Sequence, residues 1–482
     1  MRIPIIRLIA RQLRQNAFAN KGVFVLTIII GVLLLYAAVT GWLNVEDQVS
    51  MRHDSQEQAR HDWLSNPDKH PHRMAHYGHF AFRPRPSLSF FDFGMENFMG
   101  STIFLEAHKQ NATNFSEAGF STGLLRFGEL SIAMILQVLV PLLICFLGFN
   151  AIATERENGT LKVLFSQGVN WRELIAGKTL GILGVVLVLY LPVMMVSIGL
   201  WLFLIQFNIT ADEVIRLLGI TGIYFLYFVI YSLIAVLVSA WSQTARAALV
   251  KLIGIWLLFT TVLPRATQSA GSWWHPAPST TAFHAAVEKD ILKEGDSHNP
   301  NDVHYKAIKD SVLQAHGVDS VQQLPFNYSG FIMAEGEKIS AKLYNQHMER
   351  LLHTYAQQNR LAHYAAFVNP FMAVKYSSMA VTGTDYHSYI NFQQQAETYR
   401  YDLAQKMNAL QMQYISNYKP QPGEPPAMIS RSHWASLPEF SYQPVALGAA
   451  LAQESLSLIA ISGWIILLVW MVRIASRKLK AI

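Results

Sequence analysis

Six apolar stretches of spanning length constrain this chain more than any other feature of its sequence. They occupy residues 21–43, 128–153, 179–205, 214–241, 247–264 and 446–473. A helix needs about 20 apolar residues to cross a hydrocarbon core of about 30 Å, and it satisfies its own backbone hydrogen bonds. The chain is 51% hydrophobic and 15% charged, whereas soluble domains carry about 25% charged residues. We therefore predict an all-α polytopic membrane protein, in which the short fifth helix ends at Pro264.

The positions of the basic residues give the orientation of these stretches. Lys and Arg gather in 1–20, in the loop 154–178, around Arg246 and Lys251, and in the tail 474–482. Because positive residues near span ends stay on the cytoplasmic side, we expect both termini and the loop 154–178 to be cytoplasmic. The regions 44–127 and 265–445 then lie outside. The net charge of +6 follows this topology and does not indicate a nucleic-acid partner.

The two long polar regions have the composition of folded inserts. The first is dense in aromatic residues, and the second contains helical patterns at about 335–366 and 394–418. Because both are tethered to the same bundle, we expect them to pack together as a mainly helical domain. Cys145 is the single cysteine, so no disulfide within the chain can stabilise that domain.

Two amphipathic segments are expected on the cytoplasmic side. In 154–178, Leu161, Leu164 and Phe165 share one face of a short helix, and Gly159 and Gly168 permit turns at its ends. The segment 1–20 carries apolar and basic residues on separate stripes and is expected to lie along the inner leaflet. Attraction to anionic membrane lipid explains the second segment as well as a protein contact does.

The segment after the second span resembles that of the type-2 ABC exporter permeases. In that family an acidic pair, a Gly-Thr-Leu, a short helix and a Gly-Lys follow the second span. Here these are Glu155 and Glu157, Gly159-Thr160-Leu161, and Gly177-Lys178. The stretches 75–78, 105–111, 369–371 and 383–385 resemble a branch of uncharacterised function that has large extracytoplasmic inserts after the first and fifth spans. Asn170-Trp171 departs from the family, in which Ser or Pro with a basic residue is commoner.

The resemblance implies a six-helix type-2 ABC permease bundle in the bacterial inner membrane, whose segment 154–178 contacts a separate ATPase subunit. The implied ATPase-coupling residues are Glu155, Glu157, Gly159, Thr160, Leu161, Leu164, Arg172 and Lys178. Gly177-Lys178-Thr179 is not a phosphate-binding loop, because Arg172 stands where that motif needs its first glycine and a span follows. ATP and Mg²⁺ are therefore expected on the partner ATPase, and no cofactor on this chain. Two permeases, identical or sister chains, are expected to pair.

Other polar residues are candidates for transport, metal binding or catalysis. Polar residues near the outer ends of the second and sixth spans could line a translocation path or simply sit in interfacial water: Glu129, Gln137, Gln453 and Glu454. Imidazole binds zinc, copper or nickel. Four histidines lie close together in the sequence, at His70, His72, His76 and His79, but their spacing matches no known ligand motif and Pro71 interrupts it. We therefore expect no metal at these residues. Asp92, Glu106 and His108 lack a nucleophile motif, so we expect no catalytic site.

Three functions are compatible with this sequence. The first is a permease that exports a substrate, for which a peptide, a lipid, a siderophore and a metal complex all fit. The second is a subunit that relays ATPase motion to the external domain, which acts on an envelope partner without substrate crossing the bilayer. The third is a membrane scaffold or receptor that transports nothing. An ATPase that co-purifies with the chain would separate the third from the other two.

Overall fold

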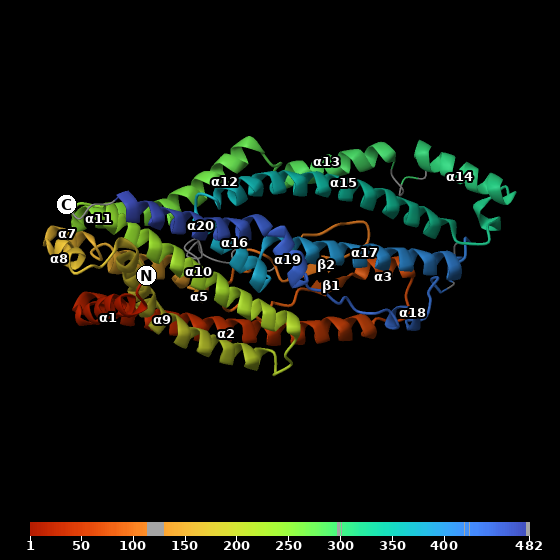
Figure 1. Ribbon diagram of the computed structural model, residues 1–482. Coiled ribbons are helices and arrows are strands. Elements are labelled where there is room, and N and C mark those ends of the chain that lie inside the picture. The colour runs from red at the N-terminus through yellow and green to blue at the C-terminus, as the bar shows by residue number, and fades with distance from the viewer. Residues whose placement is uncertain (113–129, 296–298, 300, 419, 424, 479–482) are drawn as a thin grey trace.

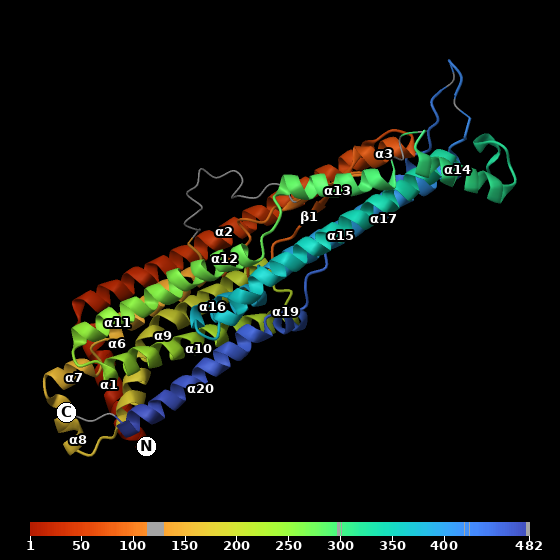
Figure 2. The same cartoon turned by 90° about the horizontal axis from the view of Figure 1, so that it is seen from above.

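The structure is a computed structural model that describes residues 1–112, 130–295, 299, 301–418, 420–423 and 425–478. The molecule is elongated, with a helix bundle at one end and a second group of helices at the other (Figures 1 and 2). Among the described residues the only sheet is an antiparallel pair, β1 (His79–Phe82) and β2 (Thr102–Leu105), in which His79 lies opposite Leu105. The predicted all-α polytopic membrane fold is confirmed.

Within the described residues, six helices are long and apolar enough to cross a membrane. They are α2 (Lys21–Ser65), the run Ile132–Glu157, α9 (Trp171–Leu204), α10 (Ala211–Trp241), the run Ala245–Trp274 and the part Ser455–Arg477 of α20 (Ser455–Lys478). Each overlaps one of the apolar stretches found in the sequence. The sixth stretch is divided, because α19 (Leu447–Gln453) ends at Glu454 before α20 begins.

Two spans contain a π-helical turn just before a proline. The second is built from α5 (Ile132–Met134), the turn η2 (Ile135–Leu139) and α6 (Val140–Gly148), with Pro141 following the turn. The fifth is built from α11 (Ala245–Leu257), the turn η3 (Leu258–Val262) and α12 (Leu263–Trp274), with Pro264 following the turn. Proline lacks an N–H and its ring crowds the carbonyl four residues earlier.

The prediction that the fifth helix ends at Pro264 is wrong, because a π turn precedes the proline and the helix continues beyond it. The N–H of Leu263 bonds the carbonyl of Leu258, five residues earlier, which is the longer spacing of a π turn. The neighbouring carbonyl of Phe259 accepts a hydrogen bond of 2.8 Å from the side chain of Asn369. The helix therefore continues past Pro264 to Trp274.

The N-terminal helix α1 (Ile3–Ala19) packs along α9. Its buried stripe includes Ile6, Ile9 and Leu13, while Arg7 and Arg11 are exposed, which confirms the predicted amphipathic pattern. Glycines on α9 allow close contact, since a Cβ at Gly177 would lie 2.7 Å from Ile9 Cβ and one at Gly181 would lie 2.9 Å from Leu13 Cβ. Small residues at a helix interface let two backbones approach in this way.

The second group of helices is called here the distal domain. It comprises the second half of α2, the β1–β2 pair and the helices α3 (Pro71–Tyr77), α13 (Thr280–Glu294), α14 (Val303–His316), η4 (Val321–Gln323), α15 (Tyr328–Ala365), α17 (Tyr386–Tyr414) and α18 (Ser432–Ala435). Trp63 of α2, Met74 of α3, Met407 of α17 and Trp434 of α18 share one apolar core. Trp63 Nε1 also donates to the carbonyl of Trp434 at 3.1 Å. The two inserts therefore pack together, as expected.

A short helix, α16 (Pro370–Thr382), connects the distal domain to the bundle. It packs against α10 and α20 and lies between α15 and α17 in the chain. Asn369 caps its first turn, and Gly383 ends it in the left-handed conformation with φ of 74°. Trp464 of α20 donates to the carbonyl of Ala366 at 3.1 Å. The distal domain is thereby joined to the spans through side chains as well as through the chain itself.

Candidate functional site

The segment that joins the second and third spans folds as two short helices, α7 (Ala153–Glu157) and α8 (Thr160–Ser166). In both views these helices lie at the same end of the molecule as the start of α1 and the end of α20 (Figures 1 and 2). The distal domain lies at the opposite end. We refer to residues 153–170 as the α7–α8 segment.

Two glycines and one serine shape the α7–α8 segment. Gly159 and Gly168 have φ of 73° and 82°, a conformation that other residues adopt at a cost, as predicted from their positions. Ser239 of α10 accepts hydrogen bonds of 3.0 Å from the N–H groups of Ile152 and Ala153. It also donates to the carbonyl of Phe149 at 2.9 Å. The serine thus pairs the backbone groups released where the second span bends into α7.

The inward side of the segment is tied to three neighbouring helices. Glu155 forms an ion pair with Lys178 of α9, and both side chains are largely buried, at 19% and 9% exposure. Arg156 donates to the carbonyl of Ser242, at the end of α10. Glu157 accepts a hydrogen bond of 3.1 Å from the N–H of Ala245, the first residue of α11. A displacement of α7 would therefore pull on α9, α10 and α11 together.

The apolar face of α8 is the one that the sequence indicated. Leu161 is completely buried in the main core, and Leu164 and Phe165 are partly buried against it. Phe165 also packs against Trp171 with ring centroids 4.9 Å apart. Leu161 consequently anchors α8 to the bundle, and Leu164 packs partly against the same core.

The outward side of α8 carries exposed residues of mixed character. Thr160 and Lys162 are exposed, and Val163 is 54% exposed although it is apolar. Val163 was not among the residues predicted from the sequence. The signal that could have found it is an apolar residue on the polar face of a short amphipathic helix. A single exposed apolar residue does not make an apolar patch, so Val163 marks the exposed side of α8 and no more.

The departure from the family pattern at Asn170-Trp171 has a structural explanation. The Asn170 side chain accepts from the N–H of Glu173 at 3.0 Å and the Glu173 side chain accepts from the N–H of Asn170, which together form a capping box at the start of α9. Arg2, which directly precedes α1, donates to Glu173 through its side chain at 2.9 Å and through its backbone N–H at 2.7 Å. Neither Arg2 nor Glu173 was identified as a candidate from the sequence, although the Asn-x-x-Glu spacing is typical of a capping box.

Arg172, one of the residues that the resemblance implies in coupling, lies beside the sixth span. It is exposed and lies 3.4 Å from the hydroxyl of Ser476, near the end of α20. The contact places Arg172 between the third and sixth spans at the end of the molecule that holds α7 and α8.

Three of the four residues predicted as candidates for a translocation path lie in the part of the chain that the structure describes, and their surroundings differ. Gln137 is buried in the second span and donates to the hydroxyl of Tyr224 at 2.7 Å. Glu454 is buried too, and it accepts a bond of 3.0 Å from Ser457. Gln453 is exposed, and Glu129 lies outside the described residues. Gln137 and Glu454 therefore belong to separate contact networks.

The Gln137 network reaches the distal end of the bundle. The hydroxyl of Tyr224 is 3.1 Å from that of Ser378 in α16, and Ser378 donates to Asp92. Asp92 also accepts a hydrogen bond of 3.0 Å from the N–H of Gly94. This chain of contacts links the second and fourth spans to the first insert through α16.

The four histidines singled out from the sequence separate into two groups. His70 caps the first turn of α3, accepting from the N–H of His72 at 3.2 Å, and His79 is buried against the ring of Trp63. His72 and His76 lie together with a third histidine, His108.

The three residues considered for catalysis do not all lie in one region. Asp92 bonds to Ser378 in the bundle, while Glu106 and His108 belong to the distal domain.

Comparisons with known protein families match most of the chain. A family model described as "ABC-2 family transporter protein" matches residues 14–272. This match covers five of the six candidate spans together with the α7–α8 segment. A second model, described as a domain of unknown function (DUF3526), matches residues 280–443, between the fifth and sixth candidate spans. A search of curated proteins finds no match.

Proposed function

This chain belongs to the ABC-2 family of transporter proteins, and from that premise we propose that it couples ATP hydrolysis on a separate ATPase to substrate export. As a family member it is a multi-pass membrane subunit of an ABC transporter. The proposal adds the location of the ATPase, the direction of transport and the residues that transmit force. It also places the subunit in the inner membrane, paired with a second permease.

The arrangement of the α7–α8 segment carries this proposal. Its outward side offers Lys162 and Val163 to a partner, while its inward side is bonded to three spans through Glu155, Arg156 and Glu157. In this proposal a load applied to α8 passes through the turn at Gly159 to α7, and from α7 to α9, α10 and α11 through these three contacts. In the proposed orientation this end faces the cytoplasm, where a nucleotide-driven ATPase can dock.

The coupling residues inferred from the sequence then divide into two roles. Gly159 and Thr160 are exposed and lie beside the docking surface, whereas Glu157 is exposed but accepts from the N–H of Ala245 at the start of α11 and belongs with the transmitting residues. Glu155, Leu161, Leu164 and Lys178 face the bundle, and Arg172 lies beside α20, so they transmit or support movement and do not contact the ATPase. The proposal consequently separates docking variants from transmission variants.

The test is to co-express the chain with its ATPase, purify the complex and measure association and permease-stimulated ATP hydrolysis. Val163→Asp should release the ATPase while leaving membrane insertion unchanged, because it places a charge in the docking surface. Val303→Asp, at an exposed position of α14 in the distal domain, is the matched control and should bind the ATPase normally.

The transmission side is tested by replacing Glu155 and Glu157 together with Ala. This variant should retain the ATPase yet lose the coupling between hydrolysis and transport in sealed vesicles. Absence of any ATPase from the purified wild-type complex would contradict the proposal and favour the scaffold reading. Normal association and normal coupling in all variants would contradict the site assignment.

A mechanical role is the second candidate function, and one observation favours it. Helix α2 has 45 residues without a break, a length of about 68 Å, so it crosses a core of about 30 Å and continues far into the distal domain. A rigid element of this kind can relay movement to a partner in the cell envelope. ATP-dependent substrate movement across sealed vesicles supports export, whereas ATP-dependent rearrangement of the distal domain without such movement supports the mechanical role.

A further inference from the structure

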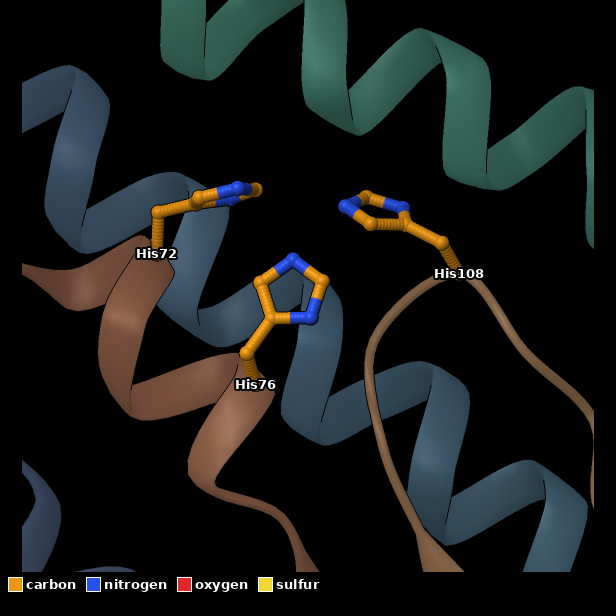
Figure 3. Close-up of side chains that lie close together, drawn as sticks. All are labelled: His72, His76 and His108. Carbon is orange, nitrogen blue, oxygen red and sulfur yellow. The ribbon is translucent and has the colours of Figure 1, made fainter.

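Three histidine side chains from two segments of the distal domain converge on one point (Figure 3). His72 and His76 come from α3, and His108 comes from the loop that follows β2. One ring nitrogen from each lies within 4.8 Å of the other two. The ring centroids of His72 and His76 are 4.6 Å apart, and that of His108 is 5.6 Å from the first and 5.4 Å from the second.

We propose that His72, His76 and His108 bind one divalent transition-metal ion of the zinc class, with a fourth coordination position open to solvent. Imidazole nitrogen is a preferred ligand for zinc, copper and nickel. Three protein ligands with one open position are a common arrangement for zinc. His76 is exposed, whereas His72 and His108 are partly buried, so an ion can enter from the side of His76.

The helical geometry of α3 explains why the linear sequence did not suggest this site. Pro71 interrupts the row of histidines in the sequence, but in the structure it occupies the first turn of α3, where a missing N–H costs nothing. His72 and His76 are then four residues apart on one helix and project from the same face. His70 and His79 are outside this helix and serve the local fold.

The third histidine is held by contacts from the second insert. His108 Nδ1 lies 3.0 Å from Glu337 Oε2, and the backbone N–H of His108 donates to the same oxygen at 3.0 Å. Glu337 is completely buried in α15, and its other oxygen lies 2.7 Å from the guanidinium of Arg400 in α17. A carboxylate that engages Nδ1 directs Nε2 toward the metal and raises the basicity of the ring.

The backbone at His108 indicates that this orientation is maintained at a cost. Its φ is 64°, a region that residues other than glycine seldom adopt. Glu106 and Lys109 form an isolated bridge across this turn. Strained conformations persist where the surrounding structure holds them, and they concentrate at functional sites. The turn brings the imidazole of His108 to the face that α3 presents.

The bound ion would connect elements from both inserts. It joins α3 to the loop after β2 directly, and Glu337 and Arg400 extend the connection to α15 and α17. An ion that binds the folded domain and not the unfolded chain stabilises the fold by mass action. The proposal concerns the distal domain alone and stands independently of the export role.

The test uses the full-length chain, purified in detergent with an affinity tag that contains no histidine and stripped with a chelator. Co²⁺ is added as a spectroscopic probe and then displaced with Zn²⁺, and thermal unfolding is followed with and without Zn²⁺. The wild type should bind one equivalent of Co²⁺ with visible ligand-field bands, and Zn²⁺ should raise its unfolding temperature. His76→Gln and His108→Gln should lose the bands and the stabilisation.

Two further variants distinguish a ligand role from a structural one. Glu337→Gln should keep the bands and weaken Co²⁺ binding by about 10- to 100-fold, because it changes only the support of His108. His61→Gln, at an exposed histidine of α2, should behave as the wild type. Because the His76 side chain is exposed, His76→Gln should have the same unfolding temperature as the wild type when chelator is present. Failure of the wild type to bind Co²⁺ stoichiometrically, or undiminished binding by His76→Gln, would overturn the proposal.

Discussion

Lys178 and Glu155 form an ion pair that joins the first turns of α9 to α7. The residues are 23 positions apart, and the pair closes the loop that contains α8. Because both side chains are largely buried, each charge has limited access to water as an alternative partner. The ion pair therefore connects α7 to the third span, in addition to the contacts that Phe165 and Asn170 make with the start of α9.

Lys178→Met should weaken this connection without preventing membrane insertion. Removal of one partner leaves the other charge partly buried and unpaired, so we expect a loss of about 1–3 kcal/mol in the free energy of unfolding. Thermal or denaturant unfolding in detergent measures the loss. Lys162→Met, an exposed lysine on α8, is the control and should change stability by less than about 0.5 kcal/mol. The double exchange Glu155→Lys with Lys178→Glu should recover part of the loss, and no recovery would argue against the pair.

Gly177→Ala should separate α1 from α9. The added Cβ would lie 2.7 Å from Ile9 Cβ, closer than packed carbon atoms approach, so α1 must shift or detach. Overpacking of this kind costs about 1–3 kcal/mol. Protease sensitivity of α1 and the unfolding temperature report the effect.

Gly199→Ala is the matched control for Gly177→Ala, because it lies on the same helix and its Cβ would meet nothing within 4 Å. It should be neutral or slightly stabilising, since alanine has the higher helix propensity. Equal behaviour of the two variants would show that the contact between α1 and α9 does not depend on the glycine.

The stability of the distal domain should fall as the pH decreases from about 6.5 to about 4. Burial lowers the pKa of His79 from 6.5 to about 4, with Glu439 raising it and Arg60 lowering it further. The unfolded chain therefore takes up a proton in this interval while the folded chain does not, so acid favours unfolding. The contribution of His79 to the free energy of unfolding is fully present above about pH 6.5, and about 3 kcal/mol of it is lost at about pH 4.

His79→Phe removes the titrating group and keeps a ring beside Trp63. Unfolding of the wild type and the variant at several pH values isolates the contribution of His79 from that of the carboxylates, which titrate in both proteins. The difference in unfolding free energy between the two proteins should change across the interval. A constant difference from pH 7 to pH 4 would show that His79 does not carry the effect.

Local patterns in the sequence predicted the spans and the amphipathic helices, because apolar length and helical spacing are properties of neighbouring residues. They also predicted the turns at Gly159 and Gly168. The continuation of the fifth helix past Pro264 was missed, because the carbonyl of Phe259 in the π turn is satisfied by the side chain of Asn369, which is distant in the sequence.

Contacts between distant residues could not be predicted from these patterns. His108 and Glu337 are 229 positions apart, and Arg2 and Glu173 are 171 positions apart. Hydropathy and residue spacing predict which face of a helix is buried, but they do not predict which side chains of other elements pack against that face. The histidine cluster was missed for this reason, since two of its members are close in sequence and the third is brought in by the turn after β2.

Cysteine labelling should place the two ends of the molecule on opposite sides of the membrane. Val163 on α8 and Val303 on α14 are 54% and 84% exposed, and the native Cys145 is buried, so single cysteines at 163 and 303 can be labelled against a low background. An impermeant maleimide applied to spheroplasts should label Val303→Cys, and it should label Val163→Cys only after lysis. The parent chain should stay unlabelled in both conditions. Because the proposed ATPase would dock from the cytoplasm, labelling of Val163→Cys from outside would contradict both the docking surface and the proposed orientation.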